Sequence, residues 1–203
     1  METTRQEDPV KNNMIYLIGI AGATSSGKTT ICEHINQRYG YTHIKLDDFF
    51  LDEKDLPFHL QWKNMEIPES LDFDYLSKVL IGIKSGERTV MPKYSKKEYR
   101  KVDFQEVIPT KINFIEGFLL FARQDIRDLL DLKIFIKVEP NIVRERRLTR
   151  QPDVKEYYLD KIIIPAYKVY GANAERYADN VIDGNRSIEE IEEDFLKIVR
   201  EHF

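Results

Sequence analysis

The sequence predicts an α/β fold, in which a parallel β-sheet carries helices on both faces. Strand-like apolar runs and helix-like amphipathic stretches alternate along the chain, and this alternation is typical of a parallel sheet with crossover helices. The length of 203 residues fits a single domain, 1–203, with a full hydrophobic core. In such sheets a ligand lies beyond the carboxyl ends of the strands, where we expect the functional residues.

The composition excludes several classes of protein. A formal net charge of −4 gives no overall basic field, so neither nucleic acid nor an anionic membrane is an expected partner. Nothing approaches the roughly 18 consecutive apolar residues of a membrane helix. The single cysteine, Cys32, cannot form an internal disulfide, which favours a cytoplasmic location. Residues 1–13 resemble no targeting peptide and are expected to be a loose terminus. The oligomeric state stays open.

The strongest motif lies near the N-terminus. The apolar run Ile15–Ile20 is predicted to be a buried strand, and residues 30–36 can continue as a helix. Between them, Gly22–Thr29 (GATSSGKT) matches the phosphate-loop pattern G-x-x-x-x-G-K-[ST] at every fixed position. The alternative, a Gly/Ser turn that binds nothing, is disfavoured by this strand-before, helix-after context. The residues expected to bind a polyphosphate are Gly22, Ala23, Thr24, Ser25, Ser26, Gly27, Lys28, Thr29 and Thr30.

This loop has a physical reason for each residue type. The two glycines let backbone N–H groups turn inward around an anion, because no Cβ obstructs them. The helix that follows presents its unpaired N–H groups to the same anion. Lys28 is expected to reach the β- and γ-phosphates, and the Thr29 hydroxyl is expected to hold Mg²⁺.

The next segments continue the alternation. His43–Leu46 is predicted to be a short strand, and Leu51–Ser70 a long irregular excursion of the kind that is usually functional. Asp72–Lys84 is predicted to be a helix that ends at Ser85-Gly86. Its buried face is expected to contain Phe73, Leu76, Leu80 and Ile83.

The middle of the chain differs from the rest. Thr89–Tyr94 and Arg100–Ile108 are predicted to be short strands joined by the polar turn Ser95–Glu98. We expect a small hairpin, about 88–108, inserted into the α/β core. Its basic residues between Arg88 and Lys101 are interpreted as a solvated face.

After this insertion the core pattern resumes. The final helix is expected to start at Ser187, because Glu190 three residues later completes a capping box. The elements predicted before it are the buried strand Lys111–Ile115 ending at Glu116, the strand Leu132–Val138, the helix Pro140–Arg150, the helix Glu156–Arg176 interrupted near Pro165, and the strand Ala178–Ile182.

Acidic residues at two strand ends are candidates for chemistry. Asp47 directly follows the second strand, where a carboxylate could accept the proton of an acceptor hydroxyl or hold a metal-bound water. Its neighbour Asp48 is expected to cap the next helix. Glu116 ends an apolar strand, where a lone acid needs a reason. We interpret it as a Mg²⁺ ligand opposite Thr29, the alternative being a charge that simply emerges at the surface.

Four arginines crowd one helix end: Arg144, Arg146, Arg147 and Arg150. Like charges at this spacing repel unless an anion or acids relieve them. The functional interpretation is a lid, about 147–160, in which Arg147 acts on the transferred phosphoryl group and Arg150 binds the nucleotide. The alternative is a set of surface ion pairs.

With these residues placed, the chain resembles the uridine kinase, phosphoribulokinase and nicotinamide riboside kinase group of P-loop kinases. The likeness runs from Ile15 to Gly184. The segments that carry it are GATSSGKTT, LDDFF, PESLDFD, IEGFLLF, RDLLDLKIFI, RERRLTR and ERYADNVI. The resemblance implies the P-loop NTPase fold and ATP-dependent phosphorylation of a hydroxyl, commonly the 5′-hydroxyl of a ribonucleoside. It also implies a catalytic base at Asp47 and a magnesium-linked position at Glu116.

The chain departs from the uridine kinase pattern at two segments. Where uridine kinases read N-[FW]-D-H-P, this chain has Asn64–Pro68, with Glu66 as a longer acid that could accept hydrogen bonds from ribose hydroxyls. Where they read P-x-Y-D-F-x-x-H, it has Pro92–Tyr99, so Tyr99 replaces the histidine. Aromatic side chains here could stack on a base or simply pack. The expected substrate-side residues are Asp47, Phe50, Glu66, Tyr94 and Tyr99.

The sequence therefore predicts a kinase that uses ATP and Mg²⁺ to phosphorylate a small hydroxyl compound, most similar to a uridine kinase acting on a nucleoside. The lid segment is more similar to nicotinamide riboside kinases, so that riboside, pantothenate or a phosphosugar stays an alternative acceptor. A third hypothesis, from another class, is a non-catalytic nucleotide-binding protein that works through a partner. The sequence does not discriminate ATP from GTP.

Overall fold

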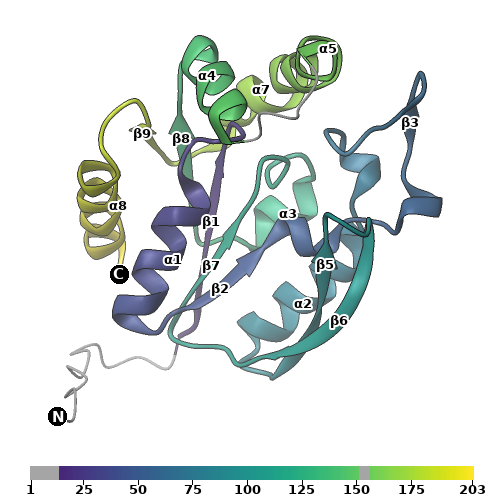
Figure 1. Ribbon diagram of the computed structural model, residues 1–203. Coiled ribbons are helices and arrows are strands. Elements are labelled where there is room, and N and C mark those ends of the chain that lie inside the picture. The colour runs from purple at the N-terminus through teal and green to yellow at the C-terminus, as the bar shows by residue number, and fades with distance from the viewer. Residues whose placement is uncertain (1–13, 151–155) are drawn as a thin grey trace, which may run out of the picture.

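A parallel sheet forms the centre of the computed structural model, which describes residues 14–150 and 156–203 (Figure 1). The strand order is β2-β7-β1-β8-β9, and each neighbouring pair runs parallel. The strands are β1 (Tyr16–Gly22), β2 (Thr42–Lys45), β7 (Ile112–Glu116), β8 (Leu132–Lys137) and β9 (Asn180–Asp183). This sheet confirms the predicted α/β fold.

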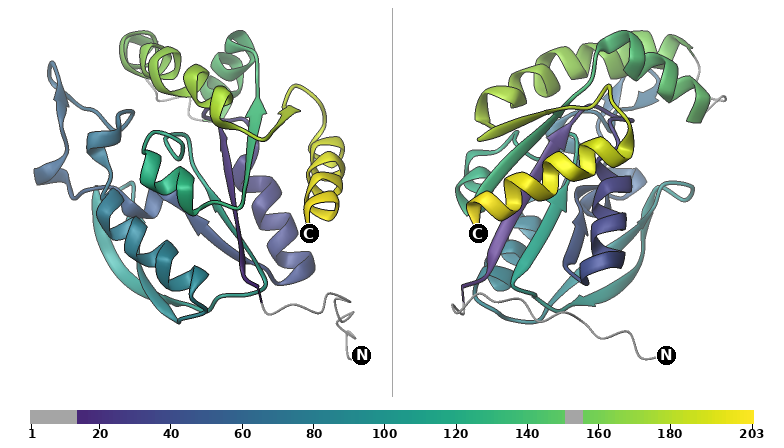
Figure 2. Two further views of the ribbon diagram at one scale, coloured as in Figure 1. Left: turned by 180° about the vertical axis from the view of Figure 1, so that it is seen from behind. Right: turned by 90° about the vertical axis from the view of Figure 1, so that its left-hand side faces the viewer.

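Helices cover both faces of the sheet, as Figure 2 shows from two sides. Side chains of successive strand residues point to opposite faces, so β1 contributes Leu17 to one hydrophobic core and Ile18 to the other. The first core lies under α2 (Phe73–Lys84) and α3 (Gln124–Leu129), and the second lies under α1 (Lys28–Tyr39), α4 (Pro140–Arg150) and α8 (Ile188–His202).

The capping box at Ser187 was predicted from the sequence, whereas the Asp72 cap of α2 was not. The Asp72 carboxylate accepts the Tyr75 N–H over 3.0 Å at the start of α2. Ser187 and Glu190 form the capping box of α8. The predicted buried face of α2 is confirmed as well, because its members are all at most 3% exposed. These local signals succeed because a cap is satisfied within one helical turn.

The segment predicted as an interrupted helix, Glu156–Arg176, follows a continuous helical path in the structure. The interruption expected near Pro165 does not occur. π-helical stretches lie on both sides of Pro165. The wider turn of a π-helix accommodates the proline ring, which has no backbone N–H to donate. The consecutive segments are α5 (Glu156–Tyr158), η4 (Leu159–Ile163), α6 (Ile164–Ala166), η5 (Tyr167–Gly171), α7 (Ala172–Ala174) and η6 (Glu175–Tyr177).

Two hairpins stand apart from the main sheet (Figure 1). The predicted insert is confirmed as the antiparallel pair β5 (Thr89–Ser95) and β6 (Arg100–Val107). The excursion after β2 contains a second, smaller hairpin, β3 (Phe58–His59) with β4 (Trp62–Lys63), which the sequence did not reveal. The same excursion holds the short helices η1 (Leu46–Phe49), η2 (Glu53–Asp55) and η3 (Pro68–Ser70).

The loose terminus expected at 1–13 and the central part of the expected lid, 151–155, lie outside the described residues. Across the ranges that are described, the helices are too short or too polar to cross a membrane.

Candidate active site

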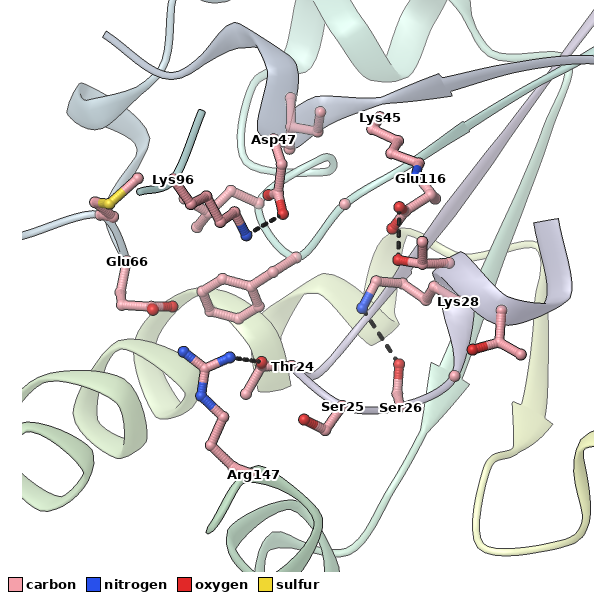
Figure 3. Close-up of a pocket in the computed structure, with 18 of the residues that line it drawn as sticks. Thr24, Ser25, Ser26, Lys28, Lys45, Asp47, Glu66, Lys96, Glu116 and Arg147 are labelled. Atoms are coloured by element: carbon pink, nitrogen blue, oxygen red, sulfur yellow. Dashed lines mark hydrogen bonds and ion pairs between the residues drawn. The ribbon is translucent and has the colours of Figure 1, made fainter. Parts of the chain in front are cut away.

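A cleft of about 1290 Å³ lies at the carboxyl edge of the sheet. Its walls come from the phosphate loop, the β2–η1 junction, the segment around β4, the β5–β6 turn and α4 (Figure 3). The predicted site residues that line this cleft are Thr24, Ser25, Ser26, Gly27, Lys28, Thr29, Thr30, Asp47, Phe50, Glu66, Tyr99, Glu116 and Arg147. Segments far apart in the sequence therefore meet where the strand-end argument placed the chemistry.

The backbone of the phosphate loop depends on its glycines. Gly22 has a φ of +151°, and a Cβ there would lie 2.4 Å from the carbonyl oxygen of Ile136 in β8. Gly27 has a φ of +94° directly before α1, and Ser25 adopts an uncommon positive φ of 58°. Backbone at positive φ allows N–H groups to turn toward an anion, which is how a loop of this type binds phosphate.

Lys28 is buried inside this loop, with 7% of its surface exposed. Its ammonium donates hydrogen bonds to the Gly22 carbonyl at 3.0 Å, the Ala23 carbonyl at 2.7 Å and the Ser26 hydroxyl at 3.3 Å. Burial lowers the pKa of Lys28, while the nearby carboxylates of Glu116 and Asp47 oppose that shift. The loop thus holds a lysine charge close to the place where its N–H groups would bind phosphates.

Thr29 and Glu116 meet across the cleft floor. The Thr29 hydroxyl donates to Glu116 Oε1 over 2.8 Å, and Glu116 is only 6% exposed. Burial raises the pKa of the Glu116 carboxyl, and the Lys28 ammonium opposes that shift.

This pair is suited to Mg²⁺ because the ion prefers oxygen ligands and usually takes one or two carboxylates together with substrate phosphates. Among the described residues there is no cluster of three or more His, Cys, Asp or Glu side chains that could hold a metal alone. A hydroxyl and one carboxylate beside a phosphate loop therefore fit a magnesium ion that is shared with a bound nucleotide.

His43 is a neighbour of this pair that sequence reasoning missed. Its Nε2 lies 3.9 Å from Glu116 Oε1 and makes no hydrogen bond with any of the described residues. Burial lowers the pKa of His43 to about 4, so the imidazole is neutral at pH 7. The sequence placed His43 in a predicted strand. It did not show which strand would pair with that one, so the nearness of Glu116 could not be predicted.

Asp47 lies on η1 and faces the cleft. Its Oδ2 is 2.5 Å from the Nζ of Lys96, which comes from the turn between β5 and β6 (Figure 3). Because that turn was interpreted as a solvated face, the sequence did not point to Lys96.

The expected role of Asp48 as a helix cap is wrong. Its Oδ1 accepts the Tyr94 N–H over 3.1 Å, so it ties β5 to η1, whereas Asp72 caps α2. The reason is tertiary, since the hairpin packs on η1 and offers an N–H there.

The other substrate-side candidates divide into two groups. Phe50, Glu66 and Tyr99 line the cleft, and Figure 3 shows the Glu66 carboxylate directed into it. Burial raises the pKa of Glu66, and the positive charge of Arg147 opposes that shift. Tyr94 lies behind Phe50, with ring centroids 5.6 Å apart, and is not part of the cleft lining.

The arginine cluster on α4 separates into different roles. Arg147 Nη1 donates to the Thr24 hydroxyl of the phosphate loop over 3.1 Å. Arg144 instead lies 3.6 Å from Glu156 and 3.7 Å from Asp160, in agreement with the surface ion pairs that were the alternative. The side chain of Arg150 lies outside the described part.

Two aromatic residues that the sequence did not single out also line the cleft. Trp62 and Tyr158 approach edge to face with ring centroids 6.2 Å apart, and the Tyr158 hydroxyl donates to the Lys63 carbonyl over 3.4 Å. The segment around β4 and the α5 region thus contact each other at the cleft.

A comparison with models of protein families shows which family this chain belongs to. Residues 17–183 match the model of the phosphoribulokinase / uridine kinase family. The chain belongs to this family. A uridine kinase of Halobacterium salinarum is 30% identical over 186 residues, which cover 85% of this chain and 82% of that protein. Uridine kinase-like protein 4 of Arabidopsis thaliana is 30% identical over 194 residues, which cover 89% of this chain but only 41% of the plant protein.

The phosphoribulokinase / uridine kinase family also supplies structural neighbours. The phosphoribulokinase from Rhodobacter spheroides has a TM-score of 0.62 at 16% identity, over 86% of this chain and 74% of that one. At this identity the likeness concerns the fold alone. It agrees with the parallel sheet and phosphate loop described above, so the P-loop kinase fold predicted from the sequence is confirmed.

Proposed function

We propose that this protein is a phosphotransferase that moves the γ-phosphoryl group of ATP to a hydroxyl of a nucleoside. The observation that carries the proposal is the meeting of three groups in one cleft: the phosphate loop with Lys28, the Thr29–Glu116 pair, and the Asp47 carboxylate. Phosphoryl transfer needs phosphate binding, a metal site and a group that orients or deprotonates the acceptor, and the cleft offers one candidate for each.

The roles follow from the contacts. The loop N–H groups and Lys28 would bind the β- and γ-phosphates. Thr29 and Glu116 would hold Mg²⁺, which would offset the negative charge of the phosphates. Asp47 would accept the proton of the acceptor hydroxyl. The hydroxyl oxygen would then bond to the γ-phosphorus while the bond between this phosphorus and ADP breaks. Arg147, placed on Thr24 by its hydrogen bond, would offset negative charge on the transferred group.

A nucleoside is the favoured acceptor because the Halobacterium relative is a uridine kinase similar over most of its length. Glu66 could accept hydrogen bonds from ribose hydroxyls, since its carboxylate is directed into the cleft. The ring of Tyr99 could stack on a base. Asp47, Glu66 and Tyr99 would together form the acceptor side.

A second candidate keeps the chemistry and changes the acceptor to nicotinamide riboside or another small metabolite. Two departures from the uridine kinase pattern favour it, Glu66 and Tyr99, because both lie on the acceptor side of the cleft. A non-catalytic nucleotide-binding role is less favoured, since Lys28, Asp47 and Glu116 all line the same cleft.

An acceptor panel tests the proposal. ADP release from Mg·ATP would be measured with uridine, cytidine, nicotinamide riboside, pantothenate and ribulose 5-phosphate, each against a reaction without acceptor. We expect ADP release to depend on a nucleoside. Preference for another compound would move the assignment to the second candidate, and tight ATP binding without transfer to any acceptor would contradict the kinase proposal.

A further inference from the structure

The contact between Lys96 and Asp47 joins two segments that are 49 residues apart in the chain. Lys96 belongs to the turn between β5 and β6, on the hairpin that stands outside the main sheet. Its side chain reaches over Phe50, with Nζ 5.9 Å from the ring centroid, and ends 2.5 Å from Asp47 Oδ2 (Figure 3). The hairpin therefore contributes a charged group to the cleft beside the candidate base.

The turn that carries Lys96 is fixed to the segment that carries Asp47. Hydrogen bonds join the two on both sides of Lys96: Tyr94 N–H to Asp48 Oδ1 at 3.1 Å, Glu53 N–H to the Tyr99 carbonyl at 2.6 Å, and Lys101 N–H to Asp52 Oδ1 at 2.8 Å. Backbone groups held in this way limit how far the turn can move. The placement of Lys96 is therefore a product of the docked hairpin.

The energetics of this ion pair argue against a purely stabilising role. The side chains of Lys96 and Asp47 are 59% and 48% exposed, and ion pairs this exposed typically contribute roughly 0–1 kcal/mol. A docked hairpin that delivers a lysine onto the candidate base therefore gains little folding stability from the contact.

Asp47 lies among several other charged groups of the cleft. Asp47 interacts with the carboxylates of Glu66 and Glu116 and with the ammonium of Lys28. Lys96 donates its hydrogen bond to the Oδ2 atom of Asp47. A carboxylate has two oxygens that can each accept a hydrogen bond, so Asp47 can keep Lys96 on one oxygen and receive a hydroxyl proton on the other.

We propose that Lys96 is a positioning residue, which fixes the Asp47 carboxylate through Oδ2 so that Oδ1 is presented to the acceptor hydroxyl. This inference rests on the proposed function. Lys96 takes no part in the proton transfer, which runs from the acceptor to Asp47. The hairpin insert then contributes to catalysis by orienting the base, in addition to forming part of the cleft wall.

Three variants test this role: Lys96→Met, Lys96→Arg and, as a matched control, Lys97→Met. Lys97 is the next residue of the same turn and is also exposed. Steady-state phosphoryl transfer from Mg·ATP would be measured with the best acceptor of the panel above, together with the affinity for a fluorescent ATP analogue and the melting temperature of each variant.

We expect Lys96→Met to lower kcat by about 10- to 100-fold, because a misplaced catalytic group costs rate in this range. The affinity for the ATP analogue and the melting temperature should stay near those of the unmodified protein. Lys96→Arg should recover most of the lost kcat, since a guanidinium can hold the same carboxylate oxygen, and Lys97→Met should behave as the unmodified protein.

Several results would overturn the inference. Lys96→Met with unchanged kcat would show that the contact is a surface ion pair. A loss of kcat that Lys97→Met shares, or that accompanies a lower melting temperature, would assign Lys96 a structural role in the turn. If the unmodified protein transferred phosphate to no acceptor, the proposed function would fail and this inference with it, which is a result distinct from a variant-specific loss.

Discussion

The two proposed sides of the cleft, one for the nucleotide and one for the acceptor, are built in different ways. On the nucleotide side, Lys28 and Glu116 are almost fully buried, and most of the contacts come from one continuous stretch around the phosphate loop. On the acceptor side, Asp47 and Lys96 are about half exposed, and Glu66 comes from the separate segment that follows β4. The first side is built mainly on one local stretch, to which β7 adds Glu116, whereas the second side is assembled from several distant segments.

This difference has a functional consequence. Backbone N–H groups around a phosphate serve every substrate of a kinase in the same way, because the triphosphate does not change. An acceptor site made of side chains on loops can change one residue at a time without disturbing the sheet. A family can therefore keep the nucleotide side and vary the acceptor, and Glu66 and Tyr99 are among the positions where this chain departs from the uridine kinase pattern.

The largest expected effect is a loss of kcat without a loss of ATP affinity, and it comes from a change at Asp47. Asp47→Asn should lower kcat by about 10²–10⁴-fold, the usual contribution of a general base, because an amide cannot take the hydroxyl proton. The affinity for ATP should change little, since Asp47 lies outside the phosphate loop. Single-turnover transfer and titration with a fluorescent ATP analogue measure the two quantities separately.

Asp48→Asn is the matched control for this change. An amide oxygen can still accept the Tyr94 N–H that Asp48 holds, so the hairpin should stay docked and kcat should be near normal. Equal activity of Asp47→Asn and the unmodified protein would remove Asp47 from the mechanism.

The same contrast explains what could be read from the sequence. The phosphate loop and the capping box at Ser187 are each formed within a few residues, and both were predicted. The candidate ligand Glu116 could be found because an acid directly after an apolar strand is unusual. The structure places it on Thr29, which the strand-end rule for parallel sheets anticipates.

The missing parts depend on contacts between distant segments. Lys96 was interpreted as part of a solvated face because nothing in its turn indicates that the hairpin docks on η1. The role of Asp48 was predicted wrongly for the same reason, since its partner Tyr94 lies 46 residues away. His43 was overlooked because the approach of Glu116 becomes visible only when β2 and β7 are paired.

The buried construction of the nucleotide side should appear in the pH dependence of stability. The pKa of His43 falls from 6.5 to about 4 on folding. Between these values the unfolded chain binds a proton that the folded chain does not. The free energy of unfolding should therefore be complete above pH 6.5 and fall as the pH drops toward 4, by up to about 3 kcal/mol.

Urea unfolding at pH 7 and pH 4.5 measures this loss. In His43→Asn the difference between the two pH values should be smaller, because asparagine does not titrate. His59 is exposed in β3, so His59→Asn should keep the full pH dependence. If His43→Asn retained it as well, the acid sensitivity would belong to other groups, and burial on the nucleotide side would not account for it.

The smallest effect tests whether Glu66 belongs to the acceptor side. Glu66→Gln keeps the size of the side chain and removes the charge, so hydrogen bonds from acceptor hydroxyls should weaken by roughly 1–1.5 kcal/mol. This corresponds to about a tenfold higher KM for the acceptor. The KM for ATP should change much less. Both values come from initial rates with one substrate varied at a time.

Glu69→Gln provides the control, because Glu69 is exposed on η3 and lies outside the cleft lining. Glu66→Asp keeps the charge on a shorter side chain. It should give a lower KM for the acceptor than Glu66→Gln only if the acceptor can move closer to the cleft wall that carries residue 66. The Arg147 guanidinium interacts with Glu66 across the cleft, which makes a second outcome informative. If Glu66→Gln raised the KM for ATP and left that of the acceptor unchanged, Glu66 would act through Arg147 on the nucleotide, and the division between the two sides would have to be drawn elsewhere.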